Sequence, residues 1–301
     1  MVITVKDLTV RYKEVLAVDG ISLSVAQGEI FGIIGPNGAG KTSTIECLEG
    51  LRKPTSGEIR VLGINPAQRR KLYQHIGVQL QETSYPPSIK VEELCRLFSS
   101  FYPAPLNYQD LLERFGLEDR GKASINNLSG GQRSKVSIIL ALLGNPQILF
   151  LDELTTGLDP KSRRDMWELI ASLRQEGKTI FMTTHYMEEA EYLCDRICMM
   201  VEGKVAALGS VEELVSQVGQ SQVITFTTDA NVSALQQFPG VSRLVSQGNR
   251  VQVFGHGQNL LKDVVVWLTN NQVNFDNLAN SNTNLEDVFF KFTGVRMEEA
   301  L

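Results

Sequence analysis

The chain lacks three features that would have pointed to other classes of protein: paired cysteines, a long apolar segment and an excess of positive charge. Its four cysteines form no C-x-x-C pair and no zinc-ligand spacing with any of its three histidines. Buried free thiols are therefore expected in place of a disulfide framework or a zinc site. The longest strongly apolar run, 136–143, is interrupted by Ser137. It is far shorter than the ~20 residues that a membrane span needs.

The charge balance argues against nucleic acid as a partner. The formal net charge is −5, so no global basic field would attract a phosphate backbone or an anionic membrane. With 43% hydrophobic and 21% charged residues the composition is that of an ordinary globular protein, and 301 residues are enough for a full α/β domain and a smaller one. Met1 opens directly into a strand pattern with no signal-like segment, so we expect a soluble cytosolic protein.

One glycine-rich segment fits the pattern G-x-x-x-x-G-K-[ST] of a phosphate-binding loop. With the serine that follows, its residues are Gly35, Pro36, Asn37, Gly38, Ala39, Gly40, Lys41, Thr42 and Ser43. An apolar strand candidate (29–34) precedes the loop and a helix candidate (43–51) follows it, so backbone N–H groups and the positive end of the helix would face one anion. This predicts a nucleoside triphosphate site. Lys41 would reach the β- and γ-phosphates, and the Thr42 hydroxyl would ligate Mg²⁺.

Two carboxylates end the apolar strand candidate 148–153. Ligands of doubly wound sheets bind at the carboxyl ends of the strands, and uncompensated carboxylates there are costly as pure structure. We therefore expect Asp152 to enter the Mg²⁺ shell and Glu153 to polarise an attacking water. His185 ends the next strand candidate, 179–184, at the same presumed edge. Although a lone histidine is usually structural, this position favours a contact with the γ-phosphate.

Two further features are ambiguous when each is taken alone. Tyr12, in a predicted loop between two strands, either stacks on a purine or packs against a neighbouring strand residue. The segment Leu128-Ser129-Gly130-Gly131-Gln132 opens the helix candidate 133–143. It is either a plain turn with an N-cap or a second helix end that seeks an anion. The phosphate loop elsewhere in the chain favours the second interpretation.

The remaining patterns predict how the chain is divided. Alternating apolar and polar residues in 2–10 and 21–25 indicate half-buried antiparallel strands, and a helical insertion at about 82–144 indicates a subdomain. We expect a first domain at 1–218. Residues 219–301 follow a β-α-β-β-α-β order, which is typical of a small ferredoxin-like α+β domain. That domain carries no catalytic constellation, which favours a dimerisation or regulatory role.

Taken in chain order, these motifs closely resemble the ATPase subunit of an ABC transporter. The motifs are the phosphate loop, Gln81 at the end of a strand candidate, residues 128–132, the Asp152-Glu153 pair, Asp159 and His185. The resemblance covers residues 1 to about 210. It implies an α/β fold of the P-loop NTPase class, with a RecA-like core, an antiparallel β subdomain and a helical subdomain.

The resemblance also implies a working arrangement. Two subunits, as a homodimer or as a pair with a sibling ATPase, would hold two ATP molecules head to tail. Each ATP would lie between the phosphate loop of one subunit and Ser129, Gly130, Gly131 and Gln132 of the other. The subunit would attach to integral membrane permease subunits on the cytoplasmic face of the cell membrane.

Individual roles follow from the same resemblance. Tyr12 would stack on adenine, and Gln81 would contact Mg²⁺ or the attacking water and sense the membrane partner. Asp159 would organise the dimer interface, and His185 would sense the γ-phosphate. One departure stands out: Leu154 occupies the position after the catalytic glutamate where family members usually have proline. The loss of a fixed φ loosens the turn that follows.

The segment 284–294 is similar to the C-terminal ending of drug- and antibiotic-exporter ATPases, which favours export through a separate permease. Three alternative functions are less consistent with the sequence. A soluble ABC-type ATPase acting on a ribosome or nucleic-acid complex is disfavoured by the single cassette, the absence of a heptad run and the acidic balance. An importer ATPase is disfavoured by the C-terminal domain and its ending. A catalytically silent protein is disfavoured because every catalytic position is filled.

Overall fold

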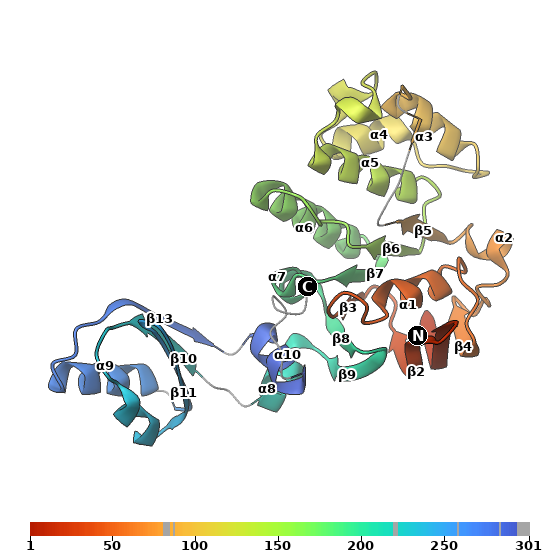
Figure 1. Cartoon of the computed structure of the whole chain (residues 1–301). Helices are drawn as coiled ribbons and strands as arrows, with labels where there is room; N and C mark the ends of the chain where they lie inside the picture. Colours follow the sequence, from red (N-terminus) through yellow and green to blue (C-terminus); the bar gives the residue numbers. More distant parts are fainter. Residues whose placement is uncertain (81–84, 87, 219–221, 258, 283, 294–301) are drawn as a thin grey trace. The chain divides into compact units, whose positions relative to one another are not determined.

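The computed structural model describes residues 1–80, 85, 86, 88–218, 222–257, 259–282 and 284–293 (Figure 1). The chain forms two compact units, of which the first runs from Met1 to Val211 and the second begins at Glu212. The helix expected to end the first domain is α8 (Val211–Val218), and all but its first residue belongs to the second unit.

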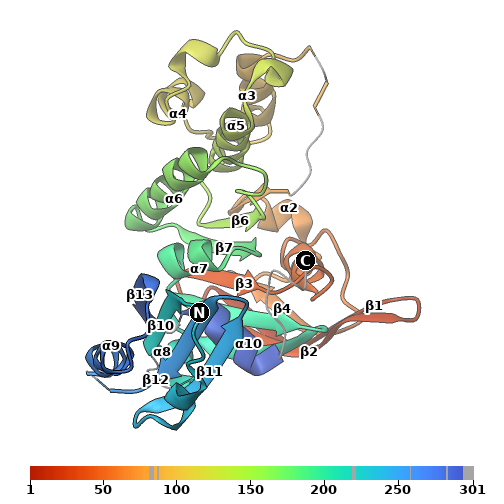
Figure 2. The same ribbon diagram turned by 60° about the vertical axis from the view of Figure 1, so that its left-hand side comes forward.

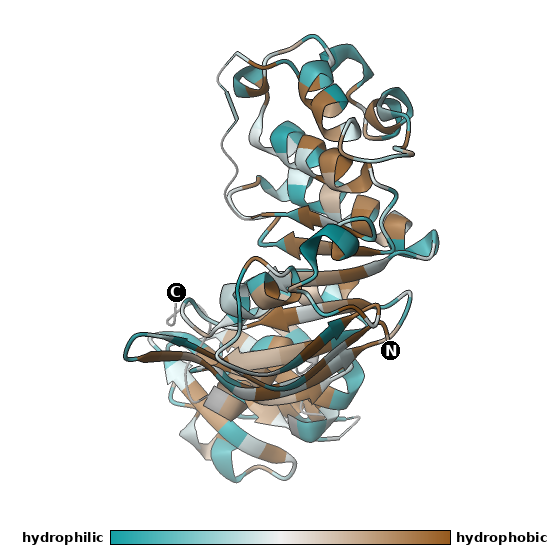
Figure 3. Cartoon of the chain, turned by 90° about the vertical axis from the view of Figure 1, so that its right-hand side faces the viewer, coloured by the Kyte–Doolittle hydropathy of each residue, from teal (hydrophilic) through white to brown (hydrophobic). Residues whose placement is uncertain are grey.

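A six-stranded sheet forms the centre of the first unit, with the strand order β5-β6-β7-β3-β8-β9. Neighbouring strands pair in parallel, apart from the antiparallel pair β8 and β9. The strands are β3 (Ile30–Ile34), β5 (Ile76–Gln79), β6 (Ile148–Asp152), β7 (Thr179–Thr184), β8 (Arg196–Val201) and β9 (Lys204–Gly209). Every residue of β3, β6 and β7 is buried, which explains their mostly apolar sequences. Figure 3 shows the same concentration of hydrophobic residues on the strands.

Helices connect the parallel strands of this sheet. They are α1 (Lys41–Leu48), α2 (Arg69–Leu72), α6 (Pro160–Gln175) and α7 (Met187–Leu193). The predicted start of α6 is confirmed, because Asp159 Oδ1 accepts the backbone N–H groups of Lys161 and Ser162 and Pro160 occupies the first turn. This connection places the carboxyl ends of β3, β6 and β7 side by side at one edge.

The N-terminal strands form a separate three-stranded antiparallel sheet in the order β2-β1-β4. Its strands are β1 (Ile3–Tyr12), β2 (Val15–Val25) and β4 (Ser56–Val61). The expectation that Tyr12 lies in a loop is wrong: Tyr12 is the last residue of β1 and pairs with Val15. The hairpin is tighter than expected because only two residues turn it, and Lys13 among them has a φ of +51°.

The helical subdomain lies between β5 and β6 in the chain and forms the upper part of Figure 2. It contains α3 (Val91–Ser99), α4 (Tyr108–Arg114), α5 (Gly130–Leu142) and the short 3₁₀ helices η1 (Glu118–Arg120) and η2 (Ile125–Asn127). The helix α5 approaches β5 so closely that a Cβ atom on Gly77 would lie 2.2 Å from the Ala141 carbonyl oxygen. This close approach fixes the subdomain against the central sheet.

The second unit contains a four-stranded antiparallel sheet in the order β11-β12-β10-β13. Its elements are β10 (Gln222–Thr227), η3 (Ser233–Gln237), β11 (Val241–Gln247), β12 (Arg250–Gly255), α9 (Leu260–Asn270), β13 (Asp276–Asn282) and α10 (Leu285–Thr293). This order is the split βαβ, ferredoxin-like arrangement expected from the sequence. The first helix of the expected β-α-β-β-α-β order is here the short 3₁₀ segment η3.

The sequence also led to expectations about the cysteines and about membrane-spanning segments. Cys47, Cys95, Cys194 and Cys198 are all buried free thiols, as expected. Within the described residues, no helix combines the length and the apolar character needed to cross a membrane.

Glu49 is an unusual buried carboxyl at the C-terminal end of α1. Glu49 is 1% exposed, and neither of its carboxyl oxygens has a hydrogen-bond partner among the described residues. Burial, followed by the nearby charges of Asp152 and Glu46, raises the pKa of Glu49 to about 9. The folded protein therefore holds a proton at neutral pH that the unfolded chain releases.

Replacing Glu49 with glutamine should flatten the pH dependence of stability. The wild-type free energy of unfolding should fall by up to about 1.4 kcal/mol per pH unit from this group as pH rises from the ordinary glutamate pKa towards 9. The uncharged amide of Glu49→Gln lacks this loss. In denaturant unfolding, the free energy of unfolding of the variant relative to that of the wild type should therefore be higher at pH 8 than at pH 6. Glu58→Gln, at an exposed ion pair with Arg60, is the control. Parallel pH dependences of wild type and Glu49→Gln would contradict the assignment.

Candidate functional site

The predicted phosphate loop, residues 35–42, joins the end of β3 to the start of α1. Gly40 precedes the helix with a φ of +97°, a left-handed conformation that favours glycine. A Cβ atom at Gly40 would also lie 2.3 Å from the Ala17 carbonyl oxygen. The glycine is therefore required twice, by backbone conformation and by the close approach of β2. The result is a helix N-terminus whose free N–H groups can face an anion.

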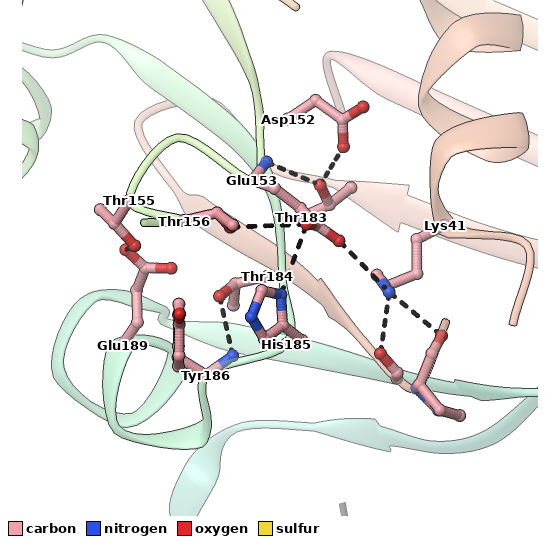
Figure 4. Close-up of polar contacts among 12 residues, drawn as sticks. Lys41, Asp152, Glu153, Thr155, Thr156, Thr183, Thr184, His185, Tyr186 and Glu189 are labelled. Carbon is pink, nitrogen blue, oxygen red and sulfur yellow. Dashed lines mark hydrogen bonds and ion pairs between the residues drawn. The ribbon is translucent and has the colours of Figure 1, made fainter. Parts of the chain in front are cut away.

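Lys41 is buried at this helix start, with a side chain that is 4% exposed. Its ammonium donates to the carbonyl oxygens of Gly35 (2.8 Å) and Pro36 (3.1 Å) and lies 3.6 Å from Glu153 Oε1 (Figure 4). Burial lowers the pKa of Lys41, and the Glu153 carboxylate opposes that change. The ammonium is thus held in place by groups of the loop and of β6's carboxyl end.

Asp152 is the last residue of β6 and is 4% exposed. Its backbone N–H donates to Gln79 Oε1 (3.1 Å), and its carboxyl Oδ1 accepts the Thr183 hydroxyl. Burial raises the pKa of Asp152, while the bond from Thr183 works in the other direction. A cation beside this carboxyl would offset the cost of its burial.

Glu153 follows directly, in the left-handed region at a φ of +47°. Its backbone N–H donates to the Thr183 carbonyl oxygen (3.1 Å), and its Oε2 lies 3.4 Å from His185 Nδ1. The two atoms lie within ion-pair distance but do not form a regular hydrogen bond. The contact with His185, and after it the charge of Lys41, lowers the pKa of Glu153 against the effect of burial. Glu153 therefore remains an ionised base at neutral pH.

Tyr12 lies beside the loop and not among these charges. Its hydroxyl is 2.9 Å from Ser43 Oγ, and the Arg52 guanidinium lies 4.3 Å from the centre of its ring. Arg52 is itself held by Glu46 at 2.6 Å. Tyr12 is 38% exposed, so it combines a fixed position with an accessible surface.

Residues 129–132 form the N-terminus of α5, in the helical subdomain. Ser129 Oγ accepts the Gln132 backbone N–H (3.3 Å), and Gln132 Oε1 accepts the Ser129 N–H (3.0 Å). The predicted N-cap is therefore a full capping box. Gly130 and Gly131 pack near Leu158 and Ser162. Figures 1 and 2 both show α5 apart from α1.

The structure brings Lys41, Asp152, Glu153 and His185 together from three adjacent strand ends. It leaves residues 129–132 elsewhere, and Gln81 lies outside the described residues. The sequence interpretation missed Gln79, Thr183 and Glu189, which are all buried polar residues bonded to the site or to the turn after it. A signal existed for Glu189: it shares the apolar face of α7 with Met187, Ala190 and Leu193, an unusual place for a carboxyl.

The donor set fits Mg²⁺ that is shared with phosphate oxygens. Asp152 supplies one buried carboxylate and Thr42 one hydroxyl in the first turn of α1. Among the residues described, no group of three acids, cysteines or histidines could hold a metal by itself. Mg²⁺ typically takes one or two carboxylates and completes its shell with phosphate and water. A lysine, a carboxylate base and a histidine beside such a centre suit hydrolysis of a terminal phosphate.

Comparison with known proteins agrees with this chemistry. The profile of the family described as ABC transporter matches residues 18–156. Nod factor export ATP-binding protein I of Ralstonia nicotianae is 33% identical over 306 residues, which cover 99% of this chain and 95% of that protein. Linearmycin resistance ATP-binding protein LnrL of Bacillus subtilis is 32% identical over 296 residues, which cover 94% and 95%. The dimeric structure of an ATP-binding cassette in a post-hydrolysis state with ADP and Pi superposes with a TM-score of 0.61 at 26% identity, covering 69% of this chain and 98% of that one.

The chain belongs to the family of ABC transporter ATP-binding proteins. It is an ATP-binding subunit and an ATPase whose activity is coupled to transport, so the fold and the family expected from the sequence are confirmed. The cassettes of this family bind nucleotide and dimerise. The alternative of a soluble ATPase acting on a ribosome or nucleic-acid complex is not supported.

The Gly40→Ala variant should lose nucleotide binding by more than about tenfold, because both the left-handed backbone and the contact with the Ala17 carbonyl forbid a Cβ atom. Equilibrium titration with a fluorescent ATP analogue measures the effect. Gly20→Ala is the matched control, since Gly20 has a φ of +64° but no atom within 4 Å of the added Cβ. Equal affinities for Gly40→Ala and Gly20→Ala would show that the loop does not cradle the nucleotide.

Proposed function

We propose that the chain hydrolyses MgATP at the interface of a head-to-tail dimer and drives export through separate permease subunits. One observation carries the proposal: each chain has two anion-seeking helix ends, α1 and α5, and only α1 lies beside the catalytic charges. Two such ends in one chain are explained if each serves a different nucleotide. The dimeric cassette with ADP and Pi supports this arrangement.

In this proposal Glu153 polarises the attacking water. Its pKa is lowered, so it is ready to accept a proton at neutral pH. Lys41 turns its ammonium to the β- and γ-phosphates, and His185, 3.4 Å from the base, contacts the γ-phosphate. Thr42, Asp152 and Gln81 would hold Mg²⁺, which supplies charge neutralisation on the phosphates.

The second half of each site comes from the other subunit. Ser129, Gly130, Gly131 and Gln132 would contact the γ-phosphate, so that ATP favours the closed dimer only through contacts made there. Asp159 directly follows Leu158, whose side chain lies 3.5 Å from a Cβ atom placed on Gly130, and it would organise the same interface. Tyr12 would stack on the adenine ring from its place next to Ser43.

Export is supported by the relatives, whose names describe Nod factor export and linearmycin resistance. The two names refer to different compounds, which fits recognition of the cargo by the permease. We infer that the subunit attaches to the cytoplasmic face of the membrane through that permease. The second unit, with its ferredoxin-like sheet, would serve dimerisation or regulation.

The Glu153→Gln variant tests the scheme. It should bind ATP, remain dimeric in its presence and hydrolyse it at least about a hundredfold more slowly, because the amide cannot accept the proton from water. Light scattering after size-exclusion chromatography gives the mass, and single-turnover assays give the rate. Glu191→Gln, on the same helix as Glu189 but exposed, is the control. ATP-bound monomers of Glu153→Gln would rule out the dimer, and a wild-type rate would rule out the base.

A further inference from the structure

Glu189 is a buried carboxyl to which the catalytic scheme assigns no task. It lies on α7, is 1% exposed, and its Oε1 accepts two hydrogen bonds. The donors are the Thr155 hydroxyl at 2.8 Å and the Trp167 indole N–H at 2.9 Å. A buried carboxyl is costly unless such bonds compensate it, so its place here needs an explanation beyond packing.

The Thr155 end of this contact belongs to the turn that follows Glu153. In that turn the Thr156 N–H donates to the Glu153 carbonyl oxygen (3.2 Å), and the Leu158 N–H donates to that of Thr155 (3.2 Å). Thr155 itself is 1% exposed. Glu153 begins the turn in a strained left-handed conformation, and Leu154 provides no ring to fix the chain. Besides the hydrogen bonds within the turn, the Thr155 hydroxyl ties the turn to a residue outside it.

The Glu189 end belongs to the helix that starts two residues after His185. Tyr186 lies between them, with its ring centre 4.1 Å from that of His185, and the Arg163 guanidinium lies 4.0 Å from the Tyr186 ring centre. Trp167 stacks on Tyr192 of α7 at 5.3 Å. These contacts fix α7 against α6, and Figure 4 shows Thr155, after the neighbouring strand β6, beside Glu189.

We propose that Glu189 is a positioning residue for hydrolysis: by accepting the Thr155 hydroxyl, it fixes the turn after Glu153 and holds the Glu153 carboxylate toward Lys41 and His185. The inference rests on the proposed role of Glu153. It links the two strand ends that supply the base and the histidine, since Thr155 follows β6 and Glu189 follows β7.

The Thr155→Val variant tests this role, because it removes the hydroxyl and keeps the side-chain shape. The kcat for ATP should fall about tenfold or more while KM and ATP affinity stay within about twofold, since a displaced base slows only the chemical step. Thr179→Val is the matched control: Thr179 is equally buried, and its hydroxyl oxygen accepts the Gly28 N–H away from the site. Loss of kcat in both variants would overturn the proposal.

Variants of Glu189 give the second measurement. Glu189→Gln retains an Oε1 acceptor and should keep kcat within about threefold, whereas Glu189→Leu should match Thr155→Val. The decisive readout is the combination of Thr155→Val with Glu153→Gln. A residue that acts through Glu153 causes no further loss of single-turnover rate once Glu153 is replaced, and a merely structural one causes its full loss again. Additive losses would overturn the inference. A wild-type rate in Glu153→Gln alone would instead overturn the proposed catalytic base.

Discussion

The buried ion pair between Lys41 and Glu153 is the constraint around which the first unit is built. Two charges that are 4% and 7% exposed are costly to bury unless each has its partners in place. Lys41 depends on two loop carbonyls and Glu153 on Thr183 and His185, so β3, β6 and β7 must all end at the same level. The strand order β6-β7-β3 meets that requirement directly. The sheet thus places a cation and a base within contact of each other and of a helix N-terminus.

The two helix starts, α1 and α5, lie apart in one chain, and the proposed head-to-tail dimer accounts for their separation. The capping box at α5 pairs the backbone N–H groups of Ser129 and Gln132, and this helix start lies in the helical subdomain, away from Lys41. The division suits a protein that must work in cycles. If ATP joins the two halves, its hydrolysis removes the contacts that keep them joined, and a partner bound to the helical subdomain would feel both events.

The sequence predicted those features whose residue types are imposed by local geometry. Gly40 and Lys41 follow from the loop, Asp159 and Pro160 from the helix start, and Asp152 and Glu153 from the end of a buried strand. The sequence could not predict features that depend on partners far away in the chain. The place of Glu189 among the apolar residues of α7 is unusual, but its partners, Thr155 and Trp167, come from other elements. Gln79 reads as an ordinary polar strand residue until the structure shows it accepting the Asp152 N–H. Tyr12 was misplaced because a two-residue hairpin turn carries no glycine or proline signal at Lys13 and Glu14.

The most direct test of the account asks whether this site drives a membrane protein. The Glu153→Gln chain would be isolated in detergent from native membranes in the presence of ATP. A Lys41→Ala chain, which cannot hold the nucleotide, would be isolated in parallel as the control. The account predicts that a polytopic membrane protein co-purifies in stoichiometric amount with the Glu153→Gln chain. Bound ATP should be retained by the Glu153→Gln chain and not by the Lys41→Ala chain. Co-purification of ribosomal proteins, or of no membrane protein at all, would contradict it.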